Sequence, residues 1–331
     1  MKKVLVLGGT HFIGRVLVQK LLEQGNYDLT LFTRGKTNPN LFPEAKRIVG
    51  DRETDDIQKI TTQNWDCIID LCAYYPNTLE NLLTHIKGKV GRYLFVSTVS
   101  VFDHENDLTI LKKEDAPILD CTPEQRTDKT GHTYGQRKAE CERILLKSGI
   151  DTVILRPSLV YGDYDYTDRF YYWLYQVQNS QEILLPENGE RPFSVTYVHD
   201  LANAIIKAVE VENHCKVYNL TTTPQTSIKQ TVESASKVLQ RQPRLTNASK
   251  AFLEKEKIAQ WMDMPLWISG DHFTHDNELV KKDFGITFTD FHQSVVETTA
   301  FYEKLNWPTP KYGISENKRL DLLQKIKDAG I

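Results

Sequence analysis

The sequence of 331 residues lacks the features that mark secreted, membrane-spanning and nucleic-acid-binding proteins. No apolar run approaches the roughly 20 residues that a membrane span requires, and the apolar run at the start breaks at Gly8, too early for the core of a signal peptide. The 41 basic and 44 acidic residues are interleaved and give a net charge of −3, whereas a nucleic-acid surface needs a net basic stripe. We therefore expect a cytoplasmic protein without a membrane or nucleic-acid partner.

Cysteine is scarce and unpatterned. The five cysteines contain no CxxC pair, which argues against both a metal site and a disulfide framework. Reduced, buried thiols are expected instead at positions 67, 72, 121, 141 and 215.

Short apolar runs alternate with helical patterns through the first half of the chain. The expected strands are residues 3–8, 28–33, 46–51, 66–71, 92–97 and 151–156, with helices at 12–24, 77–87 and 134–147 between them. Continuous apolar character suits strands that are covered on both faces, as in a parallel sheet. The alternation predicts an α/β fold with a Rossmann-type, doubly wound parallel sheet.

The second half is less regular and rich in aromatic residues after Pro157. A helix at 199–211 and a strand at 216–220 are expected to return to the sheet, and further helices are expected near 227–239, 248–261, 290–304 and 315–328. We expect a Rossmann domain formed by 1–157 with 199–220, and a smaller mixed lobe with C-terminal helices formed by 158–198 and 221–331. The long polar stretch 103–133 is expected to be an excursion near the site.

Residues 8–14, GGTHFIG, lie between the first expected strand and the first expected helix. Gly8 permits a tight turn, Gly14 allows close packing of the helix, and the helix N-terminus offers N–H groups to a pyrophosphate. His11 replaces the expected middle glycine, and histidine tolerates unusual φ values better than most residues. A turn without a ligand is the alternative, but a first βα unit favours a dinucleotide site. Its expected contacts are Gly8, Thr10, His11, Phe12, Ile13 and Gly14.

The second strand ends in LFTRGK (31–36), without the acidic residue that binds an adenosine ribose. Thr33, Arg34 and Lys36 offer a hydroxyl and two cations instead, which suit a 2′-phosphate. NADP is therefore favoured over NAD, the alternative being that Arg34 is a solvated loop residue.

The segment YGQRK places Tyr134 and Lys138 four residues apart on one face of an expected helix. An ammonium beside a phenol stabilises the phenolate, so a lowered pKa would let Tyr134 act as an acid–base group at a substrate alcohol. Thr98 or Ser97, at the end of the strand 92–97, would orient the substrate oxygen, although both hydroxyls could also serve as caps.

These motifs, with STVSVF, LRPSLVYG and YVHDLANAI in this order, resemble extended short-chain dehydrogenases/reductases, the NAD-dependent epimerase/dehydratase family, over about residues 1–220. The resemblance implies that Thr98 is the active-site hydroxyl, Tyr134 the acid–base group, and Lys138 a contact of the nicotinamide ribose. It implies a homodimer through helices 77–87 and 134–147. It also implies cofactor contacts from Asp51, Arg52, Leu71, Cys72, Ala73 and Pro157.

Two departures refine the resemblance. His11 and the LFTRGK ending are similar to an atypical subgroup that includes chloroplast stem-loop-binding proteins, although the YxxxK motif here is intact. Val99 and Ser100 stand where dehydratases carry an acid pair, so dehydration is not expected.

The expected substrate is a small molecule, either a sugar or a nucleotide sugar. Arg191 lies two residues from the position of a phosphate-binding arginine in nucleotide-sugar epimerases. Ser100, Tyr161 and Tyr164 are further candidates, and the aromatic segment 161–175 would either form a stacking wall or pack the lobe. We expect NAD(P)-dependent hydride transfer at an alcohol or ketone carbon, without a metal. The alternatives are a simple carbonyl reductase and a non-catalytic protein that binds RNA or senses NADP.

Overall fold

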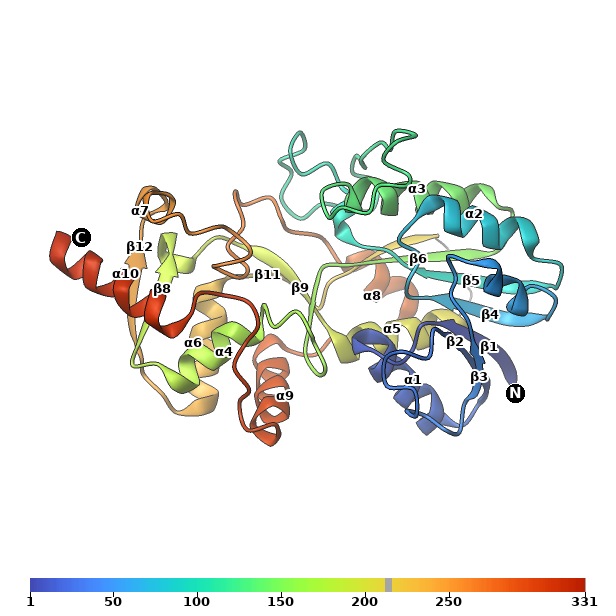
Figure 1. Ribbon diagram of the computed structural model, residues 1–331, viewed down its shortest axis with the longest axis horizontal. Helices are drawn as coiled ribbons and strands as arrows, with labels where there is room; N and C mark the ends of the chain where they lie inside the picture. The colour runs from blue at the N-terminus through green and yellow to red at the C-terminus, as the bar shows by residue number, and fades with distance from the viewer. Residues whose placement is uncertain (212–215, 331) are drawn as a thin grey trace.

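Seven parallel strands form the central sheet of the computed structural model, which describes residues 1–211 and 216–330 (Figure 1). The strand order is β10-β6-β5-β4-β1-β2-β3, with every neighbouring pair parallel. The predicted α/β fold with a doubly wound sheet is confirmed, and β10 pairs with β6 as expected. The strands are β1 (Lys2–Leu7), β2 (Tyr27–Thr33), β3 (Lys46–Val49), β4 (Trp65–Asp70), β5 (Val90–Val96), β6 (Thr152–Pro157) and β10 (Val217–Leu220).

Helices cover both faces of this sheet because its strands are apolar on both sides. In β1, Val4 and Val6 pack into one core, while Leu5 and Leu7 pack into the other. Helices α1 (Phe12–Gln24) and α5 (Val198–Glu210) cover the first face, and α2 (Pro76–His85) and α3 (Tyr134–Lys147) cover the second (Figure 1). The strand order reverses between β1 and β4, and doubly wound folds bind ligands beyond the carboxyl ends of the strands at such a point.

Most of the elements after β6, apart from α5 and β10, form a smaller mixed lobe at the other end of the molecule (Figure 1). One sheet has the order β11-β9-β7, and a second pairs β12 with β8. The lobe strands are β7 (Leu159–Tyr161), β8 (Glu182–Pro186), β9 (Phe193–Tyr197), β11 (Thr223–Thr226) and β12 (Arg244–Ala248). Besides α5, the helices after β7 are α4 (Tyr171–Asn179), α6 (Ile228–Leu239), α7 (Lys250–Lys255), α8 (Glu278–Phe284), α9 (Phe291–Lys304) and α10 (Glu316–Ala329). The short 3₁₀ helices are η1 (Asp55–Ile60), η2 (Val99–Val101) and η3 (Glu187–Gly189).

Three segments differ from, or add to, the elements expected from the sequence. The expected helix 248–261 is wrong in extent, because α7 ends at Lys255 and the chain then turns through positive φ at Lys257 and Trp261. The excursion 103–133 has no regular helix or strand among its residues and is tied to the lobe by a bridge between Lys112 and His275. Helix α8 packs against β10 at the sheet, where the rings of Tyr218 and Phe284 lie 4.7 Å apart. The exact domain division and the homodimer stay predictions.

The four described cysteines are all free, as expected. Cys67 and Cys141 are buried, whereas Cys72 and Cys121 are partly exposed, and Cys215 lies outside the described residues. Across the described ranges, no helix combines the length and apolar character that crossing a membrane requires.

Candidate active site

The glycine turn joins β1 to α1 at the carboxyl edge of the sheet. Gly8 and Gly9 have φ values of 108° and 107°, which side-chain-bearing residues rarely adopt. A Cβ atom on Gly14 would lie 2.6 Å from the Cα of Gly9, so the helix can lie this close to the turn only with glycine at position 14. The close packing predicted for Gly14 therefore exists, and the helix packs at this point against the backbone of the glycine turn.

His11 is not the strained residue that the sequence suggested. Its φ of −140° and ψ of 143° are ordinary extended backbone, and the positive φ falls on the next residue, Phe12, at 35°. The tolerance of histidine for unusual φ values is therefore the wrong explanation for its presence. Its exposed ring lies 4.5 Å from the ring of Tyr166.

The groups around this turn fit a dinucleotide, which is an anion. Helix α1 begins here, and no acidic side chain of its own first turn competes for its free N–H groups and positive dipole end. The Thr33 hydroxyl is buried without a hydrogen-bond partner. Arg34 and Lys36 are exposed, and neither has an ion-pair partner in the described part of the chain. Asn38 folds the following loop back by donating its amide to the carbonyl of Thr10 at 2.8 Å.

Arg52 lies in a buried ion pair. Its Nη1 and Nη2 atoms donate to the two carboxylate oxygens of Asp70 at 2.6 and 3.0 Å. The hydroxyl of Tyr93 and the backbone N–H of Cys72 also donate to this carboxylate, at 2.5 and 3.0 Å. Burial alone would raise the pKa of Asp70, but the Arg52 charge and these donors hold it below its usual range. Both terminal nitrogens of Arg52 are therefore paired with Asp70 at the end of β4, whereas the resemblance implies that Arg52 contacts the adenine.

The other implied cofactor contacts line the same edge. The N–H of Leu71 donates to the carbonyl of Leu7 at 3.2 Å, which joins the ends of β4 and β1. Ala73 is buried, and Asp51 is partly exposed and accepts a hydrogen bond from the N–H of Glu53 at 3.0 Å. Pro157 is buried at the end of β6.

Thr98, Ser100, Tyr134 and Lys138 are brought together beyond the ends of β4 and β5. Tyr134 is the first residue of α3, and its phenol lies close enough to the Thr98 side chain for that hydroxyl to lower its pKa. The Thr98 hydroxyl also accepts the Ser100 N–H at 3.1 Å and lies 3.2 Å from the Ser100 hydroxyl. One helical turn after Tyr134, the buried Nζ of Lys138 donates to the carbonyls of Ala73 at 3.1 Å and Val96 at 2.9 Å.

The choice between Thr98 and Ser97 is decided by a second buried cluster. The Ser97 hydroxyl donates to Glu142 at 2.5 Å, and Glu142 also pairs with Arg156 at 2.7 Å. Ser97 is thus committed to the interior, and Thr98 is the hydroxyl beside Tyr134.

The protonation of this cluster differs from the expectation. Burial raises the pKa of Tyr134 to about 12, although the hydrogen bond to Thr98 acts in the opposite direction. Burial lowers the pKa of Lys138 to about 8. The expected lowering of the Tyr134 pKa by its lysine neighbour is therefore wrong for this structure, because the loss of water around the phenol dominates.

The aromatic segment 161–175 does not form one wall. Tyr161 is 1% exposed, its ring lies 3.9 Å from that of Phe170, and its hydroxyl lies 2.5 Å from the Ser294 hydroxyl. Tyr161 therefore packs the core and is not available to a substrate. The ring of Tyr164 lies against the Arg15 guanidinium at 3.8 Å, and Tyr166 is the exposed member of the segment.

Arg191 is already neutralised in the lobe. Its Nη2 lies 2.9 Å from Glu187, whose other oxygen accepts the indole N–H of Trp267 at 2.8 Å. The structure does not bring Arg191 into contact with Tyr134 or Thr98.

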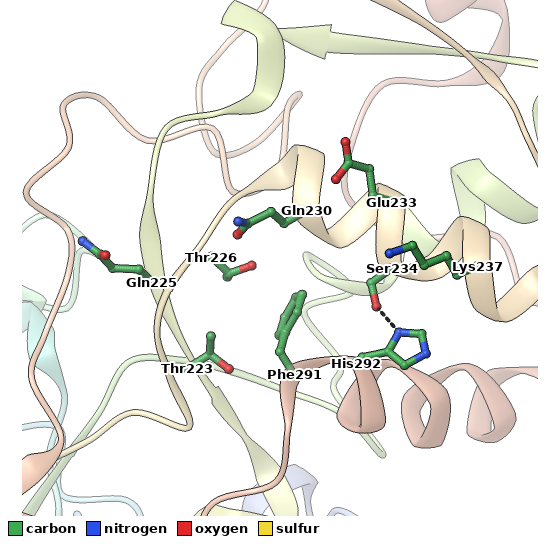
Figure 2. Close-up of a pocket in the computed structure, with 9 residues that line it drawn as sticks. All are labelled: Thr223, Gln225, Thr226, Gln230, Glu233, Ser234, Lys237, Phe291 and His292. Carbon is green, nitrogen blue, oxygen red and sulfur yellow. Dashed lines mark hydrogen bonds between the residues drawn. The ribbon is translucent and has the colours of Figure 1, made fainter.

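A pocket of about 520 Å³ lies between α6 and the start of α9, with β11 on a third side (Figure 2). Figure 2 shows the ring of Phe291 in it and the hydrogen bond of 2.9 Å between Ser234 and His292. None of the sequence-predicted site residues lines this pocket. It is therefore separate from the catalytic cluster.

Three residues near the site were missed by the sequence analysis. Asp70 holds Arg52, the ring of Tyr74 lies 6.4 Å from that of Tyr134, and Tyr166 contacts the glycine turn. Asp70 and Tyr74 both flank the fourth strand end, a position that signals a ligand edge, whereas Tyr166 was marked only as a member of the aromatic segment 161–175 and not as a neighbour of the glycine turn.

Comparisons with known proteins agree with this architecture. The model of the NAD dependent epimerase/dehydratase family matches residues 4–221. A putative UDP-glucose 4-epimerase of Methanocaldococcus jannaschii is 26% identical over 253 residues, which cover 69% of this chain and 79% of that protein. The chloroplast stem-loop binding protein of 41 kDa b from Arabidopsis thaliana is 25% identical over 235 residues, 66% of this chain, and the match spans only 58% of the plant protein.

Solved structures show the same fold. The UDP-glucuronic acid 4-epimerase of Bacillus cereus in complex with NAD superposes with a TM-score of 0.70 at 17% identity, covering 93% of this chain and 99% of that one. The UDP-glucose 4-epimerase of Thermotoga maritima gives 0.68 at 18% identity, covering 92% and 99%. Because the family model matches well over half of its length, this chain belongs to the NAD dependent epimerase/dehydratase family.

Proposed function

We propose that this protein oxidises and reduces a hydroxyl-bearing carbon of a sugar or nucleotide sugar, as an epimerase or dehydrogenase, with Tyr134 as the acid–base group. The observation that carries the proposal is the cluster of Thr98, Tyr134 and Lys138. It lies on the same edge of the sheet as the glycine turn, so one dinucleotide on α1 would reach both. Relatives named as UDP-glucose 4-epimerases support the substrate class.

A bound nicotinamide dinucleotide would accept a hydride from the substrate carbon and return it. In the oxidising direction, the phenolate form of Tyr134 takes the proton of the substrate hydroxyl as the C–H bond breaks, which leaves a carbonyl and a neutral phenol. In the reverse direction, the phenol gives this proton to the carbonyl oxygen. The Thr98 hydroxyl orients the same oxygen by a hydrogen bond. Lys138 carries its ammonium one helical turn after Tyr134, and positive charge near a phenol favours its ionised form.

Elimination of water is not part of the proposal. Dehydration needs a second acid–base group beside the reacting carbon, and the positions after Thr98 supply none. Val99 is buried, and the Ser100 hydroxyl is hydrogen-bonded to Thr98.

Replacing Tyr134 by phenylalanine tests the catalytic assignment. Tyr134→Phe removes the proton relay and should lower turnover by about 10²–10⁴-fold, with the dinucleotide Kd nearly unchanged. The readouts are formation of reduced nicotinamide and epimerisation across a panel of UDP-sugars, with calorimetry for the dinucleotide. Tyr175→Phe, on α4, is the matched control and should keep full activity. A fully active Tyr134→Phe variant would refute the assignment.

We further propose that NADP binds more tightly than NAD. Arg34 is exposed and without an ion-pair partner in the described ranges, beside the unpartnered hydroxyl of Thr33. A contact between this guanidinium and a 2′-phosphate would contribute about 1.5–3 kcal/mol, or roughly 10- to 100-fold in affinity. Arg34→Ala should remove most of this preference and leave NAD affinity unchanged, whereas Arg241→Ala, an exposed arginine of the lobe, should change neither. Equal affinities in the wild type would contradict the proposal.

A further inference from the structure

The loop 162–169, between β7 and α4, lies against the start of the first helix; we call it the strap. Its residue Tyr166 is 48% exposed, and its ring lies 4.5 Å from the ring of His11 and 6.1 Å, edge-on, from that of Phe12. His11 is the N-cap of α1 and Phe12 its first residue. The strap therefore brings a phenol from the lobe to the end of the helix where a pyrophosphate would bind.

The strap is held on both sides of Tyr166. Before it, the ring of Tyr164 packs on the Arg15 guanidinium at 3.8 Å, and Asp165 accepts two hydrogen bonds from Thr167, at 2.9 and 2.7 Å. After it, the Asp168 carboxylate accepts the backbone N–H of Lys311 at 3.1 Å. Tyr164 and Asp168 have positive φ values of 63° and 53°, and such uncommon conformations persist only where the surroundings hold them.

The polar ends of the strap region are unsatisfied. The Tyr166 hydroxyl has no hydrogen-bond partner within the described chain, and neither has the exposed ammonium of Lys311. The charge of Lys311, together with the larger effect of burial, lowers the pKa of His11, so the ammonium acts on the same helix end. Two donors, one of them cationic, thus belong to residues that lie near the beginning of α1.

Tyr166 also lies towards the reacting phenol. It is close enough to Tyr134 and Tyr74 to contribute to the pKa of both. The strap therefore spans the interval between the glycine turn and Tyr134, which the nicotinamide half of a dinucleotide would occupy.

We propose that the strap clamps the pyrophosphate of the bound dinucleotide against α1. The Tyr166 hydroxyl donates a hydrogen bond to a phosphate oxygen, and the Lys311 ammonium balances the negative charge. The inference rests on the proposed function, because it takes the glycine turn as the dinucleotide site. It also gives a role to His11, whose ring supports Tyr166 where a glycine would leave open space.

Calorimetric titration with reduced dinucleotide and with ADP-ribose, which carries the pyrophosphate without the nicotinamide, tests the clamp. Tyr166→Phe should weaken both ligands about 10- to 100-fold, the range for a hydrogen bond to a charged group. Lys311→Gln should weaken them about 2- to 5-fold, an exposed ionic contact, with a smaller salt dependence than the wild type. Lys311→Arg should retain the affinity, and Tyr175→Phe and Lys304→Gln are the matched controls.

The outcomes separate the clamp from the proposed function. If the wild type binds neither ligand, the dinucleotide site and the clamp both fail. If the wild type binds and Tyr166→Phe binds equally well, the clamp alone is overturned. Tighter binding by Tyr166→Phe would show that the strap obstructs the site, which also overturns the clamp.

Discussion

The buried ion pair between Arg52 and Asp70 gives a prediction in which stability and cofactor affinity separate. Arg52→Gln removes the charge that balances a carboxylate with no exposed surface. Removing one partner of a buried pair costs about 3–5 kcal/mol, because the remaining charge stays in the interior without compensation. The hydroxyl of Tyr93 and the N–H of Cys72 still donate to Asp70, so we expect the lower end of this range, about 3 kcal/mol.

The loss is measurable by urea and thermal unfolding. With an unfolding entropy of about 2.1 cal/mol/K per residue over 331 residues, a loss of about 3 kcal/mol should lower Tm by about 4 °C. Dinucleotide affinity should stay near the wild-type value, because the guanidinium is committed to Asp70. Arg34→Ala removes an exposed arginine without an ion-pair partner in the described ranges and should leave Tm unchanged.

The pH dependence gives the sign of the effect. In the wild type the pKa of Asp70 lies below its unfolded value, so its contribution to stability is present above the unfolded pKa and is lost as pH falls. In Arg52→Gln, burial without the cation raises this pKa, and the carboxyl takes up a proton as pH falls. The gap between variant and wild type should therefore be largest at neutral pH and shrink on acidification. A variant that unfolds like the wild type but binds dinucleotide weakly would refute this reasoning and assign Arg52 to the adenine.

Two further predictions concern stability and the turn. Burial lowers the pKa of His104 to about 4, so the folded state favours the neutral imidazole. The free energy of unfolding should therefore fall by up to about 3 kcal/mol as pH drops from about 6.5 towards 4. His104→Gln should remove this pH dependence, which urea unfolding at a series of pH values would measure. Gly14→Ala places a Cβ 2.6 Å from the Cα of Gly9 and should weaken dinucleotide binding at least about 10-fold and lower Tm. Gly131→Ala, whose Cβ would meet no atom within 4 Å, should change neither. Unchanged binding by Gly14→Ala would show that the turn moves to accommodate the methyl group.

The sheet was predictable from sequence because its strands are continuous apolar runs bounded by polar residues. In the lobe, the expected helices 227–239, 290–304 and 315–328 are confirmed as α6, α9 and α10, whereas several other elements were not predicted. Strand β12 is mostly exposed and carries no apolar pattern. Helix α4 is buried around most of its circumference, and the sequence indicated only a helical run with Phe170, Trp173, Leu174 and Val177 facing inward.

The catalytic cluster was predictable for a geometric reason. The spacing of Tyr134 and Lys138 sets their common helix face, and Thr98 follows a parallel strand whose end lies at the same edge. The partners of Arg52 and His11 were not predictable, since Asp70 and Tyr166 reach them through tertiary packing. A family resemblance implies which role a residue has, but it does not show which neighbouring side chain that residue already contacts in the fold.

The protonation of Tyr134 shows how such packing bears on function. The sequence spacing considers only the Tyr134 phenol and the Lys138 ammonium, and it predicts that the ammonium stabilises the phenolate. In the fold both groups leave water together, and burial disfavours the charged form of each. With a pKa of about 12 the phenol keeps its proton at neutral pH, while Lys138, with a pKa of about 8, stays mostly charged. Tyr134 is thus ready to donate a proton to a carbonyl, whereas accepting one from an alcohol requires further positive charge nearby. We therefore expect oxidation to accelerate with rising pH more steeply than reduction.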